Sequence, residues 1–234
     1  MSDFEVAKKP LIVAHRGASQ AVRPGNTVAA FRRAAELGAD WVELDVRLTA
    51  DARRAVHHDA ELPDGRAICE VEADRLPEFV PLLDVALAAC EGLGVNVEIK
   101  NSSDDVDFDP ARSLADAVVE ELRDVDRARV LVTSFDLRSI DRVRDLDPTV
   151  ATGLLAHDLD EPRRAIDRAV GGGHGTINPW EPYVNADFMS LARDAGLAVN
   201  VWTVNDVDRM RELIELEVDA IITDVPDVLR QLVG

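Results

Sequence analysis

The chain has 234 residues, 47% of them hydrophobic, which is enough for one α/β barrel or one doubly wound domain with a sizeable core. Its 45 acidic and 26 basic residues give a formal charge of −19, and this excludes the basic face that nucleic-acid binding requires. No apolar run approaches the roughly 18 residues of a membrane span, and the first residues, MSDFEVAKKP, lack the apolar region of a signal peptide. We therefore expect one cytoplasmic domain over residues 1–234, with no stable membrane anchor.

The acidic residues are spread along every segment, and three lysines accompany 23 arginines. This halophile-like composition suggests a host with a salt-rich cytoplasm, where self-repulsion is screened. Maximum stability in low-salt buffer would contradict that hypothesis.

The first predicted strand covers residues 11–14 and ends in a turn with the sequence HRG at residues 15–17. Thr27 is a suitable N-cap for a helix over residues 28–37, which Gly38 ends. This order, a buried strand and then a helix, is the first unit of an alternating α/β pattern.

The stretch 41–59, WVELDVRLTADARRAVHHD, is predicted to carry the main functional groups. Apolar residues at positions 42, 44 and 46 alternate with Glu43 and Asp45, so both carboxylates lie on one face of a strand. Two carboxylates side by side in an interior cost several kcal/mol unless a cation, most simply a metal ion, lies between them. An exposed amphipathic edge strand would produce the same alternation.

The residues that follow Asp45 predict a hairpin. The run 48–54 is polar and too short for a helix, so residues 53–58 should return as the second arm. That return brings His58 beside Glu43 and Asp45. Asp59 could either orient His58 or cap the following turn.

Residues 60–78 contain two prolines and an Asp-Gly pair, which indicates an irregular insertion that could form a small lid. A helix from residue 82 to 90 leads to a strand over residues 95–100. On that strand Asn96, Glu98 and Lys100 share one face, which places a third acid at a strand end.

The alternation of strands and helices continues to the C-terminus. We predict strands over residues 130–134, 149–155, 175–178, 198–204 and 220–223, and helices over residues 111–123, 137–144, 162–170, 186–195, 207–216 and 226–232. Eight strands separated by helices, without the hairpin arm, predict a (β/α)8 barrel. Catalytic groups of such barrels lie at the C-terminal ends of the strands.

A series of short motifs runs through the chain from about residue 11 to 227. They are His15-Arg16-Gly17, Pro24-Gly25-Asn26-Thr27, Ala30-Phe31, Gly38-Ala39-Asp40, Glu43-Leu44-Asp45-Val46, His58-Asp59, Glu98-Ile99-Lys100, Ser134-Phe135, Trp202-Thr203-Val204-Asn205 and Ile222-Thr223-Asp224. Together, and in this order, they resemble the motifs of the glycerophosphodiester phosphodiesterase family. The resemblance implies a TIM barrel of the phospholipase C-like phosphodiesterase type, with a short insertion at about residues 60–80. It also implies hydrolysis of small glycerophosphodiesters to glycerol 3-phosphate and an alcohol.

The resemblance also implies a role for each matching residue. Glu43, Asp45 and Glu98 would bind one divalent cation. Mg²⁺ or Ca²⁺ is expected, because these ions prefer carboxylate oxygens as ligands. His15 and His58 would be the general acid and base, in an order that stays open, and the nucleophile would be water or the glycerol 2-hydroxyl. The remaining implied roles are in substrate binding: Arg16 and Lys100 would hold phosphate oxygens and Trp202 would form an apolar wall for the glycerol.

One residue departs from the family pattern, since Gly25 stands where the family usually has glutamate.

Three rival functions also fit a barrel of this kind. They are a lysophospholipase D-like enzyme, a non-catalytic barrel that binds phosphorylated ligands, and a sugar-phosphate isomerase. The isomerase would not need three carboxylates around a metal. The non-catalytic barrel should have lost one or more of the proposed catalytic and metal-binding residues.

Overall fold

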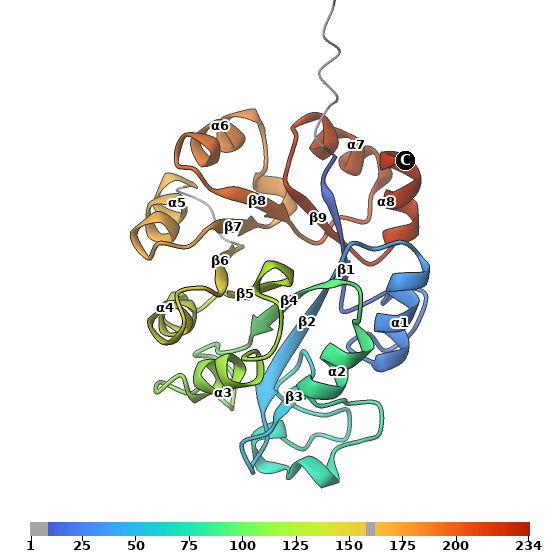
Figure 1. Cartoon of the computed structure of the whole chain (residues 1–234), viewed down its shortest axis with the longest axis vertical. Coiled ribbons are helices and arrows are strands. Elements are labelled where there is room, and N and C mark those ends of the chain that lie inside the picture. The colour runs from blue at the N-terminus through green and yellow to red at the C-terminus, as the bar shows by residue number, and fades with distance from the viewer. Residues whose placement is uncertain (1–8, 158–161) are drawn as a thin grey trace, which may run out of the picture.

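Strands alternate with helices along residues 9–157 and 162–234, the part of the chain that the computed structural model describes (Figure 1). The strands are β1 (Leu11–His15), β2 (Trp41–Leu48), β3 (Arg54–Val56), β4 (Gly94–Ile99), β5 (Val130–Ser134), β6 (Ala151–Ala156), β7 (Thr176–Pro179), β8 (Ala198–Val201) and β9 (Ala220–Thr223). The α-helices are α1 (Val28–Glu36), α2 (Leu83–Ala89), α3 (Ser113–Glu121), α4 (Leu137–Leu146), α5 (Pro162–Gly171), α6 (Ala186–Asp194), α7 (Val207–Glu215) and α8 (Pro226–Val233). Short 3-10 helices are η1 (Ile68–Glu70), η2 (Ala73–Arg75), η3 (Arg127–Arg129) and η4 (Glu181–Tyr183).

The sheet closes into a barrel because β1 pairs in parallel with both β2 and β9. The other strands lie between these two in the order β8, β7, β6, β5 and β4, all in parallel pairs. β3 is the antiparallel partner of β2, as the predicted hairpin requires. The helices surround the strands (Figure 1), so the predicted (β/α)8 barrel is confirmed.

Burial explains how β2 presents its polar side chains. Val42, Leu44 and Val46 have no exposed surface and belong to the main hydrophobic core. Because neighbouring side chains of a strand point to opposite faces, Glu43 and Asp45 must lie on the other face, toward the barrel interior. The apolar face of β2 therefore fixes the direction of its carboxylates.

β2 ends at Leu48, and its last residues pair with β3 beyond the barrel. Two other strands, β6 and β8, differ from the predicted ones by more than one residue. β6 begins at Ala151 instead of residue 149, since the Asp147 side chain accepts hydrogen bonds from the backbone N–H and hydroxyl of Thr149 and holds that residue in a turn. β8 ends at Val201, and Trp202 continues the pairing as a single bridge to Trp180.

The insertion after β3 packs against a small core of its own. The buried residues of this core are Ala55, Leu62, Ile68, Val71 and Val80. One antiparallel bridge, between Glu61 and Ala67, matches the irregular structure predicted there.

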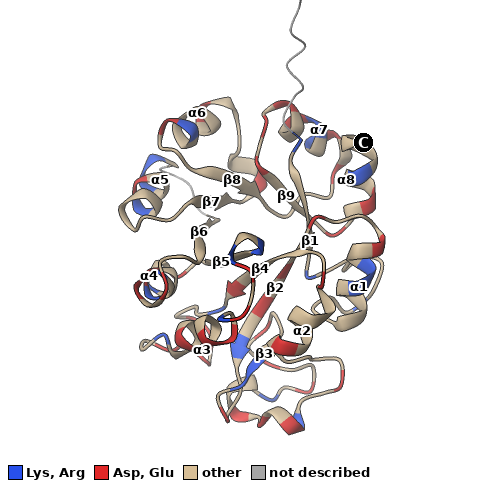
Figure 2. Cartoon of the chain, viewed as in Figure 1, with Lys and Arg blue, Asp and Glu red and all other residues tan. Residues whose placement is uncertain are grey.

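Acidic residues lie on helices around the barrel as well as on β2 (Figure 2). Among the residues that the structure describes, no helix is both long enough and apolar enough to cross a membrane.

Candidate active site

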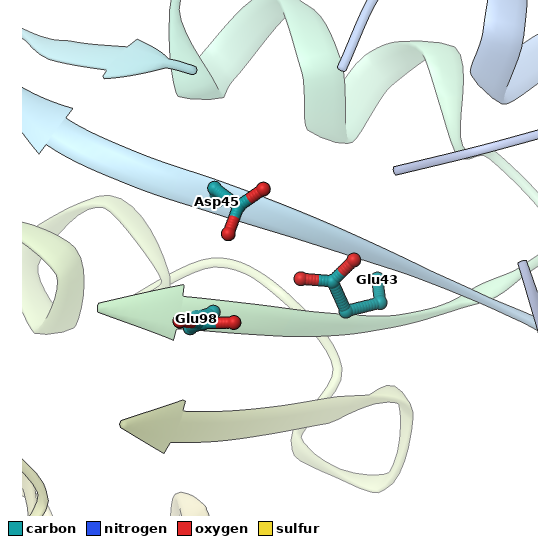
Figure 3. Close-up of side chains that lie close together, drawn as sticks. All are labelled: Glu43, Asp45 and Glu98. Atoms are coloured by element: carbon teal, nitrogen blue, oxygen red, sulfur yellow. The ribbon is translucent and has the colours of Figure 1, made fainter. Parts of the chain in front are cut away.

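Three carboxylates from two neighbouring strands meet inside the mouth of the barrel. The strand register pairs Asp45 on β2 with Glu98 on β4, and it pairs Glu43 with His15 on β1. One carboxylate oxygen from each of the three acids lies within 4.8 Å of the others (Figure 3). All three side chains are buried, so this part of the predicted site is one compact cluster.

The negative charge of this cluster is only partly compensated by its neighbours. Glu43 Oε1 and Asp45 Oδ1 have no hydrogen-bond partner in the described part of the chain. Burial, together with the charge of Asp45, raises the pKa of Glu43 to about 8, and burial also raises the pKa of Glu98. Burial acts in the same direction on Asp45, but Lys100 and Arg16 outweigh it and lower the pKa of Asp45. Crowded oxygen ligands with unused lone pairs fit one hard divalent cation.

Two cations and one amide surround Asp45. Asn26 Nδ2 donates a hydrogen bond of 2.7 Å to Asp45 Oδ2, and Arg16 Nε lies 3.2 Å from the same oxygen. Lys100 Nζ lies 3.3 Å from Asp45 Oδ1 and donates a hydrogen bond of 2.7 Å to Glu98. These contacts hold the carboxylates in place and keep two positive charges at the rim of the cluster.

Gly25, the position that departs from the family pattern, lies against the turn that carries Arg16. A Cβ atom at Gly25 would lie 2.9 Å from Arg16 Cβ and 3.0 Å from Ser19 Cβ. The absence of a side chain therefore permits the close packing of this turn, and Asn26 supplies the hydrogen bond that orients Asp45.

His15 is held by a carboxylate from the far end of the chain. Its Nδ1 atom lies 2.7 Å from Asp224 Oδ1, and Asp224 also accepts hydrogen bonds from Ser19 and Asn205. Because an ionised carboxylate can only accept, Nδ1 carries the proton and Nε2 faces the site, 4.0 Å from Glu43. Burial is the largest influence on His15 and opposes a charged imidazole, but the hydrogen bond to Asp224 and the negative charges of Glu43 and Asp224 together outweigh burial and raise the pKa of His15.

His58 follows β3 and pairs with its neighbour. Its Nδ1 atom lies 2.7 Å from Asp59 Oδ1, so Asp59 contacts the histidine, which was one of its two predicted uses. Burial is the largest influence on His58 and lowers the pKa of its imidazole. The Asp59 side chain is 74% exposed, whereas that of Asp224 is 27% exposed, so the two histidines have unequal partners.

Arg47 connects the His58 segment to the loop after β4. Its buried guanidinium donates from Nε to the carbonyl oxygen of His58 at 2.8 Å, from Nη1 to both oxygens of Asp107 at 2.7 Å, and from Nη2 to Asp105 at 2.9 Å. All three nitrogens of the guanidinium therefore donate hydrogen bonds. Arg47 acts as a brace between two segments that border the site.

Arg47→Met is expected to lower the free energy of unfolding by about 3–5 kcal/mol, because it leaves two acids together without their cation. Arg47→Lys keeps the charge but loses the fork, so its loss should be smaller. Urea denaturation of both variants measures this difference. A loss below about 1 kcal/mol for Arg47→Met would show that the brace adds little.

The predicted site residues surround one pocket of about 100 Å³. Its lining includes seven of them: His15, Arg16, Glu43, His58, Glu98, Lys100 and Trp202. The eighth, Asp45, has no exposed surface and contacts the pocket through Arg16 and Lys100. Trp202 donates from Nε1 to the carbonyl oxygen of Asn178 at 2.7 Å, and Phe135, Leu155 and Ile222 complete an apolar side of the pocket.

Sequence reasoning assigned no role to Asn26, Arg47, Phe135 or Asp224. The role of Arg47 could have been found from the sequence, since its position on β2 places it on the same face of the strand as Glu43 and Asp45. The role of Asp224 could also have been found, because it follows the C-terminal end of the last strand.

Known proteins resemble this chain over almost its whole length. The model of the Glycerophosphoryl diester phosphodiesterase family matches residues 15–67 and 64–228. A glycerophosphodiester phosphodiesterase of Caldanaerobacter subterraneus subsp. tengcongensis is 30% identical over 249 residues, which cover 96% of this chain and 98% of the relative.

Two solved structures share the fold. A glycerophosphodiester phosphodiesterase of Thermotoga maritima has a TM-score of 0.79 at 27% identity, over 95% of this chain and 98% of the other. A phosphodiesterase of Oleispira antarctica, solved in complex with the product sn-glycerol-3-phosphate, has a TM-score of 0.84 at 24% identity, over 95% of this chain and 96% of the other.

Proposed function

The chain belongs to the glycerophosphoryl diester phosphodiesterase family, and from this premise we propose that it hydrolyses glycerophosphodiesters to glycerol 3-phosphate and an alcohol. The observation that carries the proposal is the meeting of Glu43, Asp45 and Glu98 in a pocket that is lined by two histidines. Three buried carboxylates, two of which keep an oxygen without a hydrogen bond, have no evident structural purpose, whereas they suit metal-assisted phosphate chemistry.

In this proposal Glu43, Asp45 and Glu98 hold one divalent cation, Mg²⁺ or Ca²⁺. When bound, the cation supplies positive charge beside a non-bridging oxygen of the phosphate. Arg16 and Lys100 bind the other phosphate oxygens, for which their place at the rim of the cluster suits them.

The two histidines move the protons. One takes a proton from the attacking oxygen, which belongs to water or to the glycerol 2-hydroxyl, and the new P–O bond forms. The P–O bond to the alcohol breaks, and the other histidine donates a proton to the departing oxygen. Attack by water gives glycerol 3-phosphate directly. Attack by the 2-hydroxyl gives a cyclic phosphate, and water then opens this ring at the P–O bond to the 2-oxygen while the two histidines exchange their roles. His15 and His58 suit this pair of roles because each holds Nδ1 on a carboxylate and leaves Nε2 for the substrate.

The apolar side of the pocket suits the glycerol moiety. Trp202, Phe135, Leu155 and Ile222 line it, and the indole of Trp202 is fixed by its hydrogen bond to Asn178. Positioning of this kind lowers the entropic cost of bringing the phosphate to the catalytic groups.

A coupled assay for glycerol 3-phosphate tests the proposal. We expect product from glycerophosphodiesters with Mg²⁺ or Ca²⁺, and a fall of about 10²-fold or more with a chelator, because the carboxylates alone repel the phosphate. Full activity with the chelator would contradict the metal role. Binding of glycerol 3-phosphate without turnover of any diester would instead favour the non-catalytic barrel.

A lysophospholipase D-like activity is the second candidate, because Phe79, Val106 and Phe135 are exposed in cavities that His58 also lines. An assay for released choline with lysophosphatidylcholine as substrate tests it, because this cleavage leaves an acylated glycerol phosphate instead of glycerol 3-phosphate. Release of choline from this lipid faster than from glycerophosphocholine would favour the lipid substrate.

A further inference from the structure

A cavity of about 570 Å³ opens beside the catalytic pocket, on the side of His58. His58, Glu98, Lys100 and Phe135 line both spaces, so they are continuous. The proposed reaction separates glycerol 3-phosphate from an alcohol, and the glycerol has its place against Trp202. The cavity is therefore available for the alcohol.

The outer wall of this cavity is acidic. Besides Glu98 it contains five carboxylates, which are Asp59, Glu61, Asp104, Asp105 and Asp136. Its two cations, Arg47 and Lys100, are already engaged, by Asp105 and Asp107 and by Glu98 and Asp45 respectively.

Two of the wall carboxylates are exposed and free to face a ligand. The side chains of Glu61 and Asp104 form no hydrogen bond or ion pair with the described residues, which are 9–157 and 162–234. A positive group in the cavity would meet uncompensated negative charge.

The same cavity has an apolar and aromatic part. Phe135 is 39% exposed, and its ring packs edge-on against Trp202 with centroids 5.5 Å apart. Val106 is 61% exposed and lines the cavity as well. An ammonium group, above all one that carries methyl groups, is attracted both by an aromatic face and by nearby carboxylates.

The cavity that adjoins the pocket at His15 and Arg16 has a different character. It is lined by His15, Arg16, Arg23 and Asp224, so two arginines face one acid that His15 already engages. A cationic group would be repelled there. The two cavities beside the pocket thus differ in the sign of their charge. A positively charged alcohol group is therefore favoured in only one of them, the acidic cavity.

We propose that the acidic cavity beside His58 is the head-group site and that it takes an alcohol bearing an ammonium group. The proposal rests on the proposed phosphodiesterase function and adds a substrate class to it. The chain should prefer the glycerophosphodiesters of amino alcohols to those of neutral polyols.

The test compares kcat/KM for glycerophosphocholine and glycerophosphoethanolamine with that for glycerophosphoglycerol, in low salt and with the activating cation. We expect a preference for the cationic substrates of about three- to tenfold, the size that two partly exposed charge contacts and one aromatic contact provide. The preference should shrink as salt is added. In the double variant Glu61→Gln/Asp104→Asn the ratio of kcat/KM should fall toward one.

A matched double variant, Asp187→Asn/Glu215→Gln, removes the same charge from exposed positions on α6 and α7 and should keep the wild-type ratio. Equal kcat/KM for cationic and neutral substrates, or an unchanged ratio in Glu61→Gln/Asp104→Asn, would overturn the head-group proposal while hydrolysis stands. Failure to hydrolyse any of the diesters would overturn the phosphodiesterase function and this proposal together.

Discussion

Glu43→Gln is expected to lower kcat/KM about 10²- to 10³-fold and, at the same time, to stabilise the metal-free protein above neutral pH. The loss of activity follows because one charged ligand of the proposed cation disappears, and removal of one electrostatic stabiliser has an effect of this size. The gain in stability follows because the 3% exposed side chain of Glu43 lies beside Asp45. A substitution that lowers the activity but raises the stability identifies a residue whose role is functional and not structural.

The pH dependence of that stability has a definite sign. Burial and the charge of Asp45 raise the pKa of Glu43 from its ordinary value of 4.5 to about 8 in the folded protein. Between these values the folded state binds more protons than the unfolded state, so the free energy of unfolding falls as the pH rises. The contribution of this group is fully present below pH 4.5, falls by about 1.4 kcal/mol for each pH unit, and is lost above about pH 8.

Urea denaturation at pH 6, 7 and 8 with a chelator measures this slope. The glutamine variant should lose stability less steeply than the wild type, while Asp187→Asn, an exposed control on α6, should keep the wild-type slope. A cation at 100 times its Kd should stabilise the wild type by about 2.7 kcal/mol and the glutamine variant by less. Equal slopes in the wild type and the glutamine variant would show that folding does not raise the pKa of Glu43.

The part of the site that lies within one hairpin could be predicted from the sequence. The alternation along β2 and the short turn before β3 depend on neighbouring residues, so the common face of Glu43 and Asp45 and the return of the chain toward His58 follow from local patterns. The barrel also followed from the repeated order of strands and helices.

Contacts between distant segments could not be predicted in the same way. Asp224 lies 209 residues from His15, and the two meet only because β9 pairs with β1 to close the barrel. No periodicity within a segment indicates which of the 45 acids becomes the partner of a strand-end histidine. The brace of Arg47 is similar, since Asp105 and Asp107 belong to a loop whose path the sequence pattern leaves open.

Asp224→Asn is expected to lower kcat about 10- to 100-fold, the range found for partners that orient a functional side chain. His15→Ala should cost more, about 10²- to 10⁴-fold, because it removes the acid or base itself. Asp59→Asn is the matched control for the other histidine. Its effect should be smaller than that of Asp224→Asn, since Asp59 is 74% exposed and water screens its charge.

A double-mutant cycle decides whether Asp224 works through His15. If the carboxylate only positions and charges the imidazole, Asp224→Asn should cause no further loss of kcat once His15 is alanine, so the two effects are strongly non-additive. The imidazole of His15 should also titrate at lower pH in the asparagine variant, because burial then acts without the hydrogen bond that raises its pKa. NMR of the metal-free protein follows that titration. Additive losses of kcat, or an unchanged titration of His15, would mean that Asp224 serves the Ser19 and Asn205 segments instead, to which it is also bonded.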